Sequence, residues 1–154
     1  MGDNHSPVGL HLKRPCLLVS DLERSLKIYR DILGFRLDYQ SPADPDSYLY
    51  TVFALPPTAS LTFAAFSTPN ESRALALAEV KGIVLPSTQP PYRAGLVIQV
   101  DSLDKILSQW QALDLPICPP NHFTASDRHF TEQGVFDCDR HLLILYESRL
   151  LANE

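Results

Sequence analysis

The sequence predicts an α+β fold in which two βαβββ modules form one domain. The main observation is an internal repeat: segment 19–29, VSDLERSLKIY, reappears at a constant offset as segment 100–110, VDSLDKILSQW. Each copy follows a short apolar run and precedes further strand-like sequence. Two copies of one strand–helix–strands unit in a chain of 154 residues indicate a single pseudo-symmetric domain.

Charge and composition exclude several classes of partner. The formal net charge is −5 and the Lys and Arg residues are scattered, which argues against nucleic acid. No apolar run approaches the roughly 20 residues that a membrane-spanning helix needs. The three cysteines are odd in number and form no C-x-x-C pair, which favours reduced thiols. We therefore expect a cytoplasmic protein with neither a membrane nor a nucleic-acid partner.

The first module is predicted to begin with a strand over 13–19 and a helix over 20–34. Ser20 and Glu23 have the spacing of a capping box at the helix start. Gly34 supplies a left-handed residue at the helix end. The other strands of this module are expected at 35–39, 48–55 and 60–66.

A second helix is predicted over 71–80, because Thr68 and Glu71 form another capping box and Gly82 follows as a terminator. The Pro-rich segment 86–91 marks the connection between the halves. The prediction is one domain over 12–148, composed of module 12–68, linker 69–92 and module 93–148. Residues 1–11 are expected to be disordered.

The second module is predicted to repeat the order of the first. A strand over 94–100 precedes a helix capped by Asp101 that runs to about residue 113. A turn is expected at 137–140. The remaining strands are expected at 115–118, 129–136 and 142–146.

This organisation resembles the vicinal oxygen chelate superfamily, also called the glyoxalase/bleomycin-resistance/dioxygenase superfamily. Two segments carry the resemblance: 19–35, VSDLERSLKIYRDILGF, and 136–147, FDCDRHLLILYE. The second resembles the family's Asp-Pro-Asp-Gly-Asn turn, with Cys138 and Arg140 substituted. The resemblance implies a glyoxalase-like domain whose paired modules surround a U-shaped cavity, and often a homodimer.

Metal-dependent members of the superfamily place four ligands in this cavity, one from the first and one from the last strand of each module. Carried over to this chain, the positions are Arg14, Thr62 (or Phe63 in a shifted register), Gly95 and Ile144. None is a usual metal ligand. No cofactor is therefore predicted, and a divalent metal is expected only if a non-standard site exists.

The predicted lining of the cavity is mostly apolar and suits a small organic ligand. Arg14 offers a planar fork for an anionic group; the alternatives are a structural ion pair with Asp or Glu, or an exposed arginine at the strand end. Cys16 is a weak candidate nucleophile and reads more simply as an inert buried thiol. The predicted ligand-binding residues are Arg14, Cys16, Tyr48, Tyr50, Thr62, Gln99, Ile144 and Tyr146.

His129 and Glu132 are the candidate catalytic residues, because their strand can reach the mouth of the cavity. With His122 and Asp137 they also compose a candidate displaced metal site. The leading hypothesis is a protein that binds a small organic molecule without a metal at the usual positions. The alternative is a lyase, isomerase or dioxygenase that uses a relocated metal or acid–base groups. A third class is a structural or regulatory dimer with a filled cavity.

Overall fold

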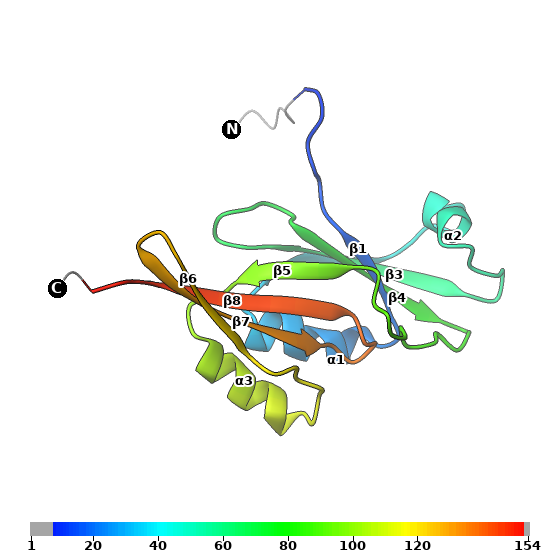
Figure 1. Ribbon diagram of the computed structural model, residues 1–154. Helices are drawn as coiled ribbons and strands as arrows, with labels where there is room; N and C mark the ends of the chain where they lie inside the picture. The colour runs from blue at the N-terminus through cyan, green and yellow to red at the C-terminus, as the bar shows by residue number, and fades with distance from the viewer. Residues whose placement is uncertain (1–7, 153–154) are drawn as a thin grey trace.

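The computed structural model describes residues 8–152, and residues 1–7 of the segment expected to be disordered lie outside this range. It contains two four-stranded mixed sheets, which confirm the α+β fold of two βαβββ modules (Figure 1). The strand order is β1-β4-β3-β2 in the first sheet and β5-β8-β7-β6 in the second. In each sheet the first and last strands of the module pair in parallel, and the other pairs are antiparallel.

The first module contains one long helical segment and one short helix. Helix α1 continues directly into a π-helical stretch, η1, which ends just before Gly34 with its φ of +91°. The left-handed residue predicted at the end of this helix is therefore confirmed. The elements are β1 (Cys16–Val19), α1 (Leu22–Leu26), η1 (Lys27–Ile32), β2 (Arg36–Pro42), α2 (Tyr48–Val52), β3 (Ser60–Ser67) and β4 (Leu75–Lys81).

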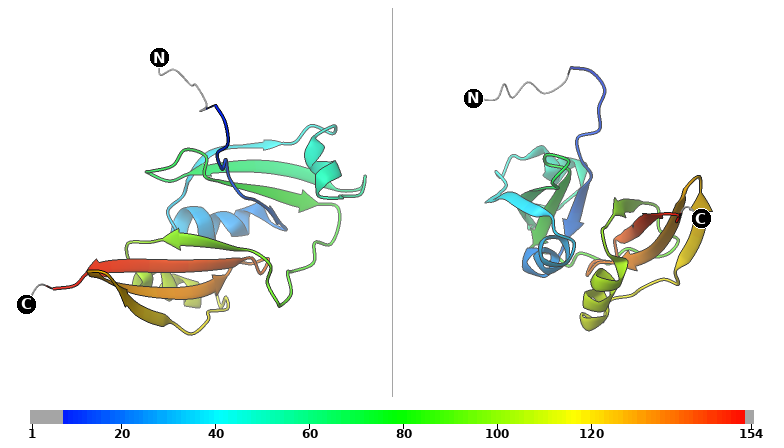
Figure 2. Two further views of the ribbon diagram at one scale, coloured as in Figure 1. Left: turned by 45° about the horizontal axis from the view of Figure 1, so that its top comes forward. Right: turned by 90° about the vertical axis from the view of Figure 1, so that its left-hand side faces the viewer.

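The second module repeats the order with a single helix. Its elements are β5 (Gly95–Gln99), α3 (Leu103–Ala112), β6 (Asn121–Ala125), β7 (Arg128–Phe136) and β8 (Leu142–Leu150). Helices α1 and α3 lie on the same side of the two sheets, as the right-hand view of Figure 2 shows. The main core fills the space between these helices and the sheets, with Tyr29 and Trp110 among its fully buried side chains. These two residues are equivalent in the sequence repeat, so the repeat identifies the centre of the core.

The helix caps differ from the prediction by one residue. The side chain of Asp21, rather than Ser20, accepts from the Arg24 N–H. In α3 the cap is Ser102, rather than Asp101, and it accepts from the Lys105 N–H. Ser and Asp are both good N-caps and adjoin each other in both copies, so sequence alone did not fix which one the chain uses.

The strand predicted over 48–55 is wrong, because this segment forms the short helix α2 and a turn. Ser47 caps the helix by accepting from the Leu49 N–H. Leu49 and Tyr50 pack on the sheet beside Leu61. A run of apolar and aromatic residues this short does not distinguish a strand from a buried helix.

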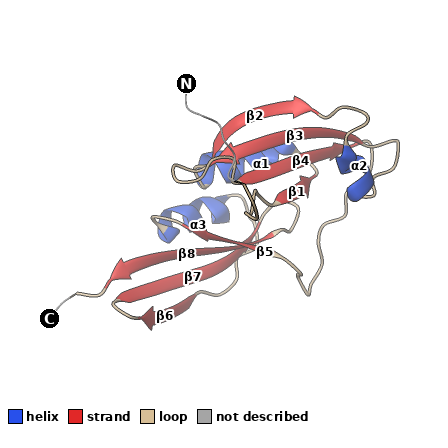
Figure 3. Cartoon of the chain, turned by 90° about the horizontal axis from the view of Figure 1, so that it is seen from above, coloured by secondary structure: helices blue, strands red, loops and turns tan. Residues whose placement is uncertain are grey.

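The helix predicted over 71–80 is also wrong, because residues 75–81 form β4, a central strand of the first sheet (Figure 3). The Thr68 hydroxyl does accept from the Glu71 N–H, as a capping box requires, but Arg73 then adopts a φ of +48°. The chain therefore turns here instead of continuing as a helix. Because β4 is covered on both faces, it reads as a continuous apolar run.

The first module consequently extends to Lys81, and the predicted boundary at residue 68 and linker over 69–92 are wrong. Gly82 does not end a helix. A Cβ at this position would collide with the Thr58 carbonyl oxygen, and φ is +88°. The glycine is needed where the chain leaves β4 and passes close to another loop.

In the second module the strand predicted over 115–118 is reduced to a single bridge between Ile117 and Val135. The edge strand is β6, which the sequence analysis missed. All its residues are exposed, so no apolar alternation reveals it.

Asp137 joins the two modules. Tyr29 of η1 donates its hydroxyl to Asp137 Oδ2 at 2.7 Å, and the backbone N–H groups of Asp139 and His141 donate to Oδ1 at 2.9 Å each. Next to this turn, His141 Nε2 lies 2.7 Å from the Leu18 carbonyl oxygen, and the Ser20 N–H donates to Asp139 Oδ1. The turn predicted at 137–140 is thus confirmed, and it fastens β1 and η1 to the second module.

We expect Tyr29→Phe to lower the free energy of unfolding by about 1–3 kcal/mol at neutral pH, because it leaves a buried carboxylate oxygen without its donor. Burial already raises the pKa of Asp137, while His141 and the Tyr29 hydrogen bond oppose this rise. Removing the hydroxyl raises the pKa further. The loss of stability should therefore be complete above the raised pKa and shrink as the pH falls below it, where the carboxyl is protonated.

Urea unfolding of both proteins at several pH values measures this loss. Tyr48→Phe is the matched control, because Tyr48 is 74% exposed and should change stability little. Equal losses for the two variants would mean that Asp137 does not depend on the Tyr29 hydroxyl.

Candidate functional site

The cavity of the predicted fold would lie on the faces of the sheets turned away from α1, η1 and α3. We call these faces the cavity side. Alternation along each strand and the strand register decide which residues belong to it. In the first sheet one row on the cavity side consists of Tyr39, Ala65, Ala76 and Cys16.

Most of the cavity side of the first sheet is filled. Leu49 and Tyr50 of α2, together with Ile83 and Leu85, pack against Leu61 and the β4 residues beside it. The Tyr50 hydroxyl accepts from the Leu61 N–H at 2.9 Å, so this predicted ligand residue holds α2 on the sheet. Tyr48, two residues earlier on the same short helix, is exposed, and the two tyrosines do not form the pair that a strand would give.

The segments that lead into the parallel strands β1 and β4 bring two arginines into contact. Arg14 Nη1 donates to the Arg73 carbonyl oxygen at 3.5 Å, and the Arg73 guanidinium lies 5.3 Å from the centre of the Tyr39 ring. Tyr39 in turn contacts Phe63, with ring centres 5.9 Å apart. Arg73 was missed by the sequence analysis because it was assigned to a helix instead of the turn before β4.

Cys16 lies next to this group but has the properties of a structural thiol. Burial raises its pKa above the usual value, and the charge of Arg14 lowers it by a smaller amount. Because the thiolate is the nucleophile, the net rise argues against the nucleophilic role considered for Cys16.

The cavity side of the second sheet is open. Val97 on the edge strand β5 is 66% exposed and pairs with Ile144, which is half-buried. The Tyr146 hydroxyl donates to Gln99 Oε1 at 3.2 Å. Three of the predicted ligand residues, Gln99, Ile144 and Tyr146, therefore share one accessible face.

Thr62 does not face the cavity side. It pairs with Glu79 on the face turned towards α1; Phe63 is the neighbouring β3 residue on the cavity side, but neither residue lies on the last strand of the module. The last strand of the first module is β4 rather than β3, and it does contain a carboxylate, Glu79. Glu79 Oε2 accepts from the Leu22 N–H at 2.6 Å, and in the second module Glu147 Oε2 accepts from the Leu103 N–H at 3.1 Å. Each module thus uses a glutamate of its last strand to cap its own helix.

The positions that hold a metal in metal-dependent members do not fit one here. In the structure they correspond to Arg14 and Ala76 in the first module and to Gly95 and Ile144 in the second. None of these four side chains supplies a lone pair for a metal: they are, in this order, a cation, a methyl group, a hydrogen atom and an aliphatic chain. Within residues 8–152, moreover, no group of three or more His, Cys, Asp and Glu side chains is arranged to hold a metal ion.

The candidate catalytic residues are separated by the sheet. Glu132 pairs with Tyr146 on the cavity side, where Asn121 Nδ2 donates to its Oε1 at 2.9 Å. His129 is an odd number of residues away on β7, faces α3, and stacks on His122 at 5.8 Å between ring centres. Asp137 is buried in the junction between modules. The displaced metal site of His122, His129, Glu132 and Asp137 therefore does not assemble.

A family model described as the Glyoxalase/Bleomycin resistance protein/Dioxygenase superfamily matches residues 11–142. The chain belongs to this superfamily. Its members' fold extends over both modules of this chain, including the Asp137 turn and the start of β8. No curated protein matches the chain significantly. No helix among residues 8–152 is long and apolar enough to cross a bilayer.

Solved structures of the superfamily show the same fold at low identity. A glyoxalase family protein from Bacillus cereus is 13% identical, with a TM-score of 0.71 over 99% of both chains. The trypanothione-dependent glyoxalase I of Leishmania major is 19% identical, with a TM-score of 0.61 over 90% of this chain and 87% of the other. The fosfomycin resistance protein FosX of Listeria monocytogenes, complexed with Mn(II) and sulfate, is 17% identical, with a TM-score of 0.57 over 92% and 91%.

We expect the purified protein to retain no stoichiometric metal after incubation with Zn, Ni, Mn or Fe(II) and desalting, because the four usual positions carry no metal ligands. Elemental analysis of the desalted protein measures this. One metal per chain, lost in both His122→Ala and His129→Ala, would contradict the expectation and identify a two-histidine site on the α3 side.

Proposed function

We propose that this superfamily member binds a small, partly apolar organic anion on its cavity side, without a metal at the usual positions. The observation that carries the proposal is the meeting of Arg14 and Arg73 beside Tyr39. A guanidinium presents several donors in one plane, which suits a carboxylate, sulfonate or phosphonate.

The two guanidinium groups are available for such a group. Among the described residues, neither takes part in an ion pair. The nearby acid, Asp38, is engaged by the Ser67 hydroxyl and by Arg36, and these contacts, with a smaller contribution from the charge of Arg73, hold its pKa below the usual value. The charge of Arg73 is therefore not neutralised by a direct contact with Asp38.

The apolar part of the ligand is expected on the open face of the second sheet. Val97, Ile144 and Tyr146 offer an apolar surface there, and the Gln99–Tyr146 pair provides polar atoms for orientation. A mainly apolar site with a few polar groups is usual for small-molecule binding. The FosX structure was solved with Mn(II) and sulfate ion; in this chain the arginines would supply positive charge for an anionic group.

Two further expectations belong to this proposal. The exposed Phe123 and Leu150 form apolar surface on the second sheet, outside the proposed ligand surface, that a homodimer would cover. The three cysteines are free thiols, which agrees with a cytoplasmic location. Light scattering at several protein concentrations tests the dimer.

Arg14→Ala and Arg73→Ala should each weaken binding of anilinonaphthalene sulfonate by roughly 1.5–3 kcal/mol, that is, about tenfold or more, because each removes a charge-assisted hydrogen bond. Fluorescence titration of the wild type and the variants gives the dissociation constants. A neutral naphthalene dye of similar size should bind the two arginine variants almost as tightly as the wild type.

Lys13→Ala is the matched control, since it removes the positive charge of an exposed side chain next to Arg14 in the chain. Equal dissociation constants for the wild type, Arg14→Ala and Arg73→Ala would reject the two arginines as the anchor. If Lys13→Ala weakened dye binding as much as the two arginine variants, the overall positive charge of this segment, and not specific contacts of Arg14 and Arg73, would determine the affinity.

Metal-free catalysis is the second candidate function, and Glu132 is the observation that favours it. Its carboxylate lies on the cavity side beside Tyr146, where a general base would reach a bound substrate. Asn121 holds one carboxylate oxygen, which leaves the other for a proton.

Fosfomycin appears in the name of one structural relative, FosX. It can be used to distinguish a protein that only binds a small anion from an enzyme that converts it. The binding proposal expects no conversion of fosfomycin by metal-free protein, as followed by phosphorus NMR. Turnover that falls at least about 100-fold in Glu132→Gln but persists in His129→Gln would instead favour the enzyme, because these side chains lie on opposite faces.

A further inference from the structure

A hollow lies on the α3 side of the second sheet, opposite to the proposed ligand surface. Its volume is about 440 Å³, within the range of small-molecule sites. One wall is the first two turns of α3, with Leu103, Asp104 and Leu107. The floor and the other walls come from β6, β7, β8 and the residue before β6. No element of the proposed function uses this pocket.

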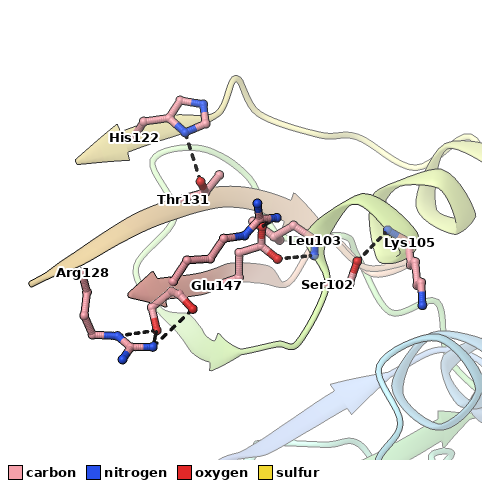
Figure 4. A network of polar contacts seen from close by, with 9 residues as sticks. Ser102, Leu103, Lys105, His122, Arg128, Thr131 and Glu147 are labelled. Atoms are coloured by element: carbon pink, nitrogen blue, oxygen red, sulfur yellow. Dashed lines mark hydrogen bonds and ion pairs between the residues drawn. The ribbon is translucent and has the colours of Figure 1, made fainter. Parts of the chain in front are cut away.

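The strand register brings its polar side chains together. His122 pairs with Thr131, which pairs with Glu147, so the three lie in one row across β6, β7 and β8 (Figure 4). In the neighbouring row His129 pairs with Arg149. All five side chains face α3, because they occupy alternate positions on their strands.

The two imidazole rings lie nearly parallel to each other as a stacked pair. Their centres are 5.8 Å apart and their planes differ by 15°, and His122 Nδ1 lies 3.1 Å from Thr131 Oγ1. His122 is exposed and His129 is half-buried. A planar group can stack on such rings, while the ring nitrogens remain able to hydrogen-bond.

The charges around the rings come from three side chains. Arg149 Nη2 donates to Glu147 Oε1 at 3.0 Å, and Glu147 Oε2 caps α3 through the Leu103 N–H. Glu147 is thus occupied on both oxygens, and Asp104 is the other carboxylate of the lining. Arg149 remains 72% exposed at its side chain and has donors left over. With neutral imidazoles the lining carries two negative charges and one positive charge, and with both imidazoles protonated it carries two negative and three positive charges.

We propose that this pocket is a second binding site, for a small planar organic anion whose ring stacks on His122 and His129 and whose carboxylate meets His129 and Arg149. Histidine ordinarily gains its charge between pH 5 and 8. Binding therefore strengthens as the pH falls through this range. The site is independent of the proposed function, because Arg14, Arg73 and Val97 lie elsewhere.

Benzoate is a suitable probe, because it has one ring and one carboxylate and keeps its charge over this range, and benzamide is its neutral counterpart. We expect benzoate to bind about tenfold or more tightly near pH 5 than near pH 8, as measured by isothermal titration calorimetry. Benzoate should also shift the imidazole NMR signals of His122 and His129. Benzamide should bind weakly and without a dependence on pH.

His129→Gln and Arg149→Gln should each remove most of the increase in benzoate affinity at low pH. Both variants are tested, so that a folding defect in one of them does not decide the result. His11→Gln is the matched control, since His11 is exposed and contacts the backbone outside the pocket. Benzamide binding as tightly as benzoate, an affinity that does not change with pH, or unchanged binding in both pocket variants would overturn the proposal. Loss of binding in Arg14→Ala with retention in His129→Gln would assign benzoate to the cavity side instead and would equally overturn it.

Discussion

The buried carboxylate of Asp137 is the interaction on which the arrangement of the two modules depends. It accepts hydrogen bonds from Tyr29 of the first module and from two backbone N–H groups of its own turn. The same turn places His141 against the end of β1. Because a buried carboxylate without donors is costly, the turn and η1 are held in one relative position. The core between the helices, with Tyr29 and Trp110, is assembled around this junction.

Other carboxylates of the chain also serve its structure. Glu79 and Glu147 come from equivalent last strands, and each caps the helix of its own module. A carboxylate that accepts from a helix N-terminus is aimed at the helix side of the sheet, away from the cavity side. The last strands therefore contain an acid in both modules, but neither acid is placed for a metal in the family cavity. Positive charge on the cavity side comes from Arg14 and Arg73 instead.

The two faces of the second sheet have different chemistry. The cavity side combines exposed apolar residues with the Gln99–Tyr146 pair, whereas the α3 side carries His122, His129 and Arg149 over a hollow. Strict alternation along β7 separates His129 from Glu132 although they are only three residues apart. Residues that are close in the sequence and suggest one site thus lie on two opposite faces of the sheet. Substitutions on one face can therefore be tested without changing side chains on the other.

The sequence by itself determined the repeat, the fold class, the helix of each module and the Asp137 turn, because amphipathic helices and turns are specified by neighbouring residues. It also placed Gln99, Ile144 and Tyr146 on one face through simple alternation. Only the tertiary structure decided that 75–81 is a strand, since an apolar run covered on both faces has no period of its own. That decision moved Glu79 into the last strand, extended the first module to Lys81 and brought Arg73 beside Arg14. The hollow beneath α3 likewise depends on contacts between segments far apart in the chain, and no local pattern in the sequence records them.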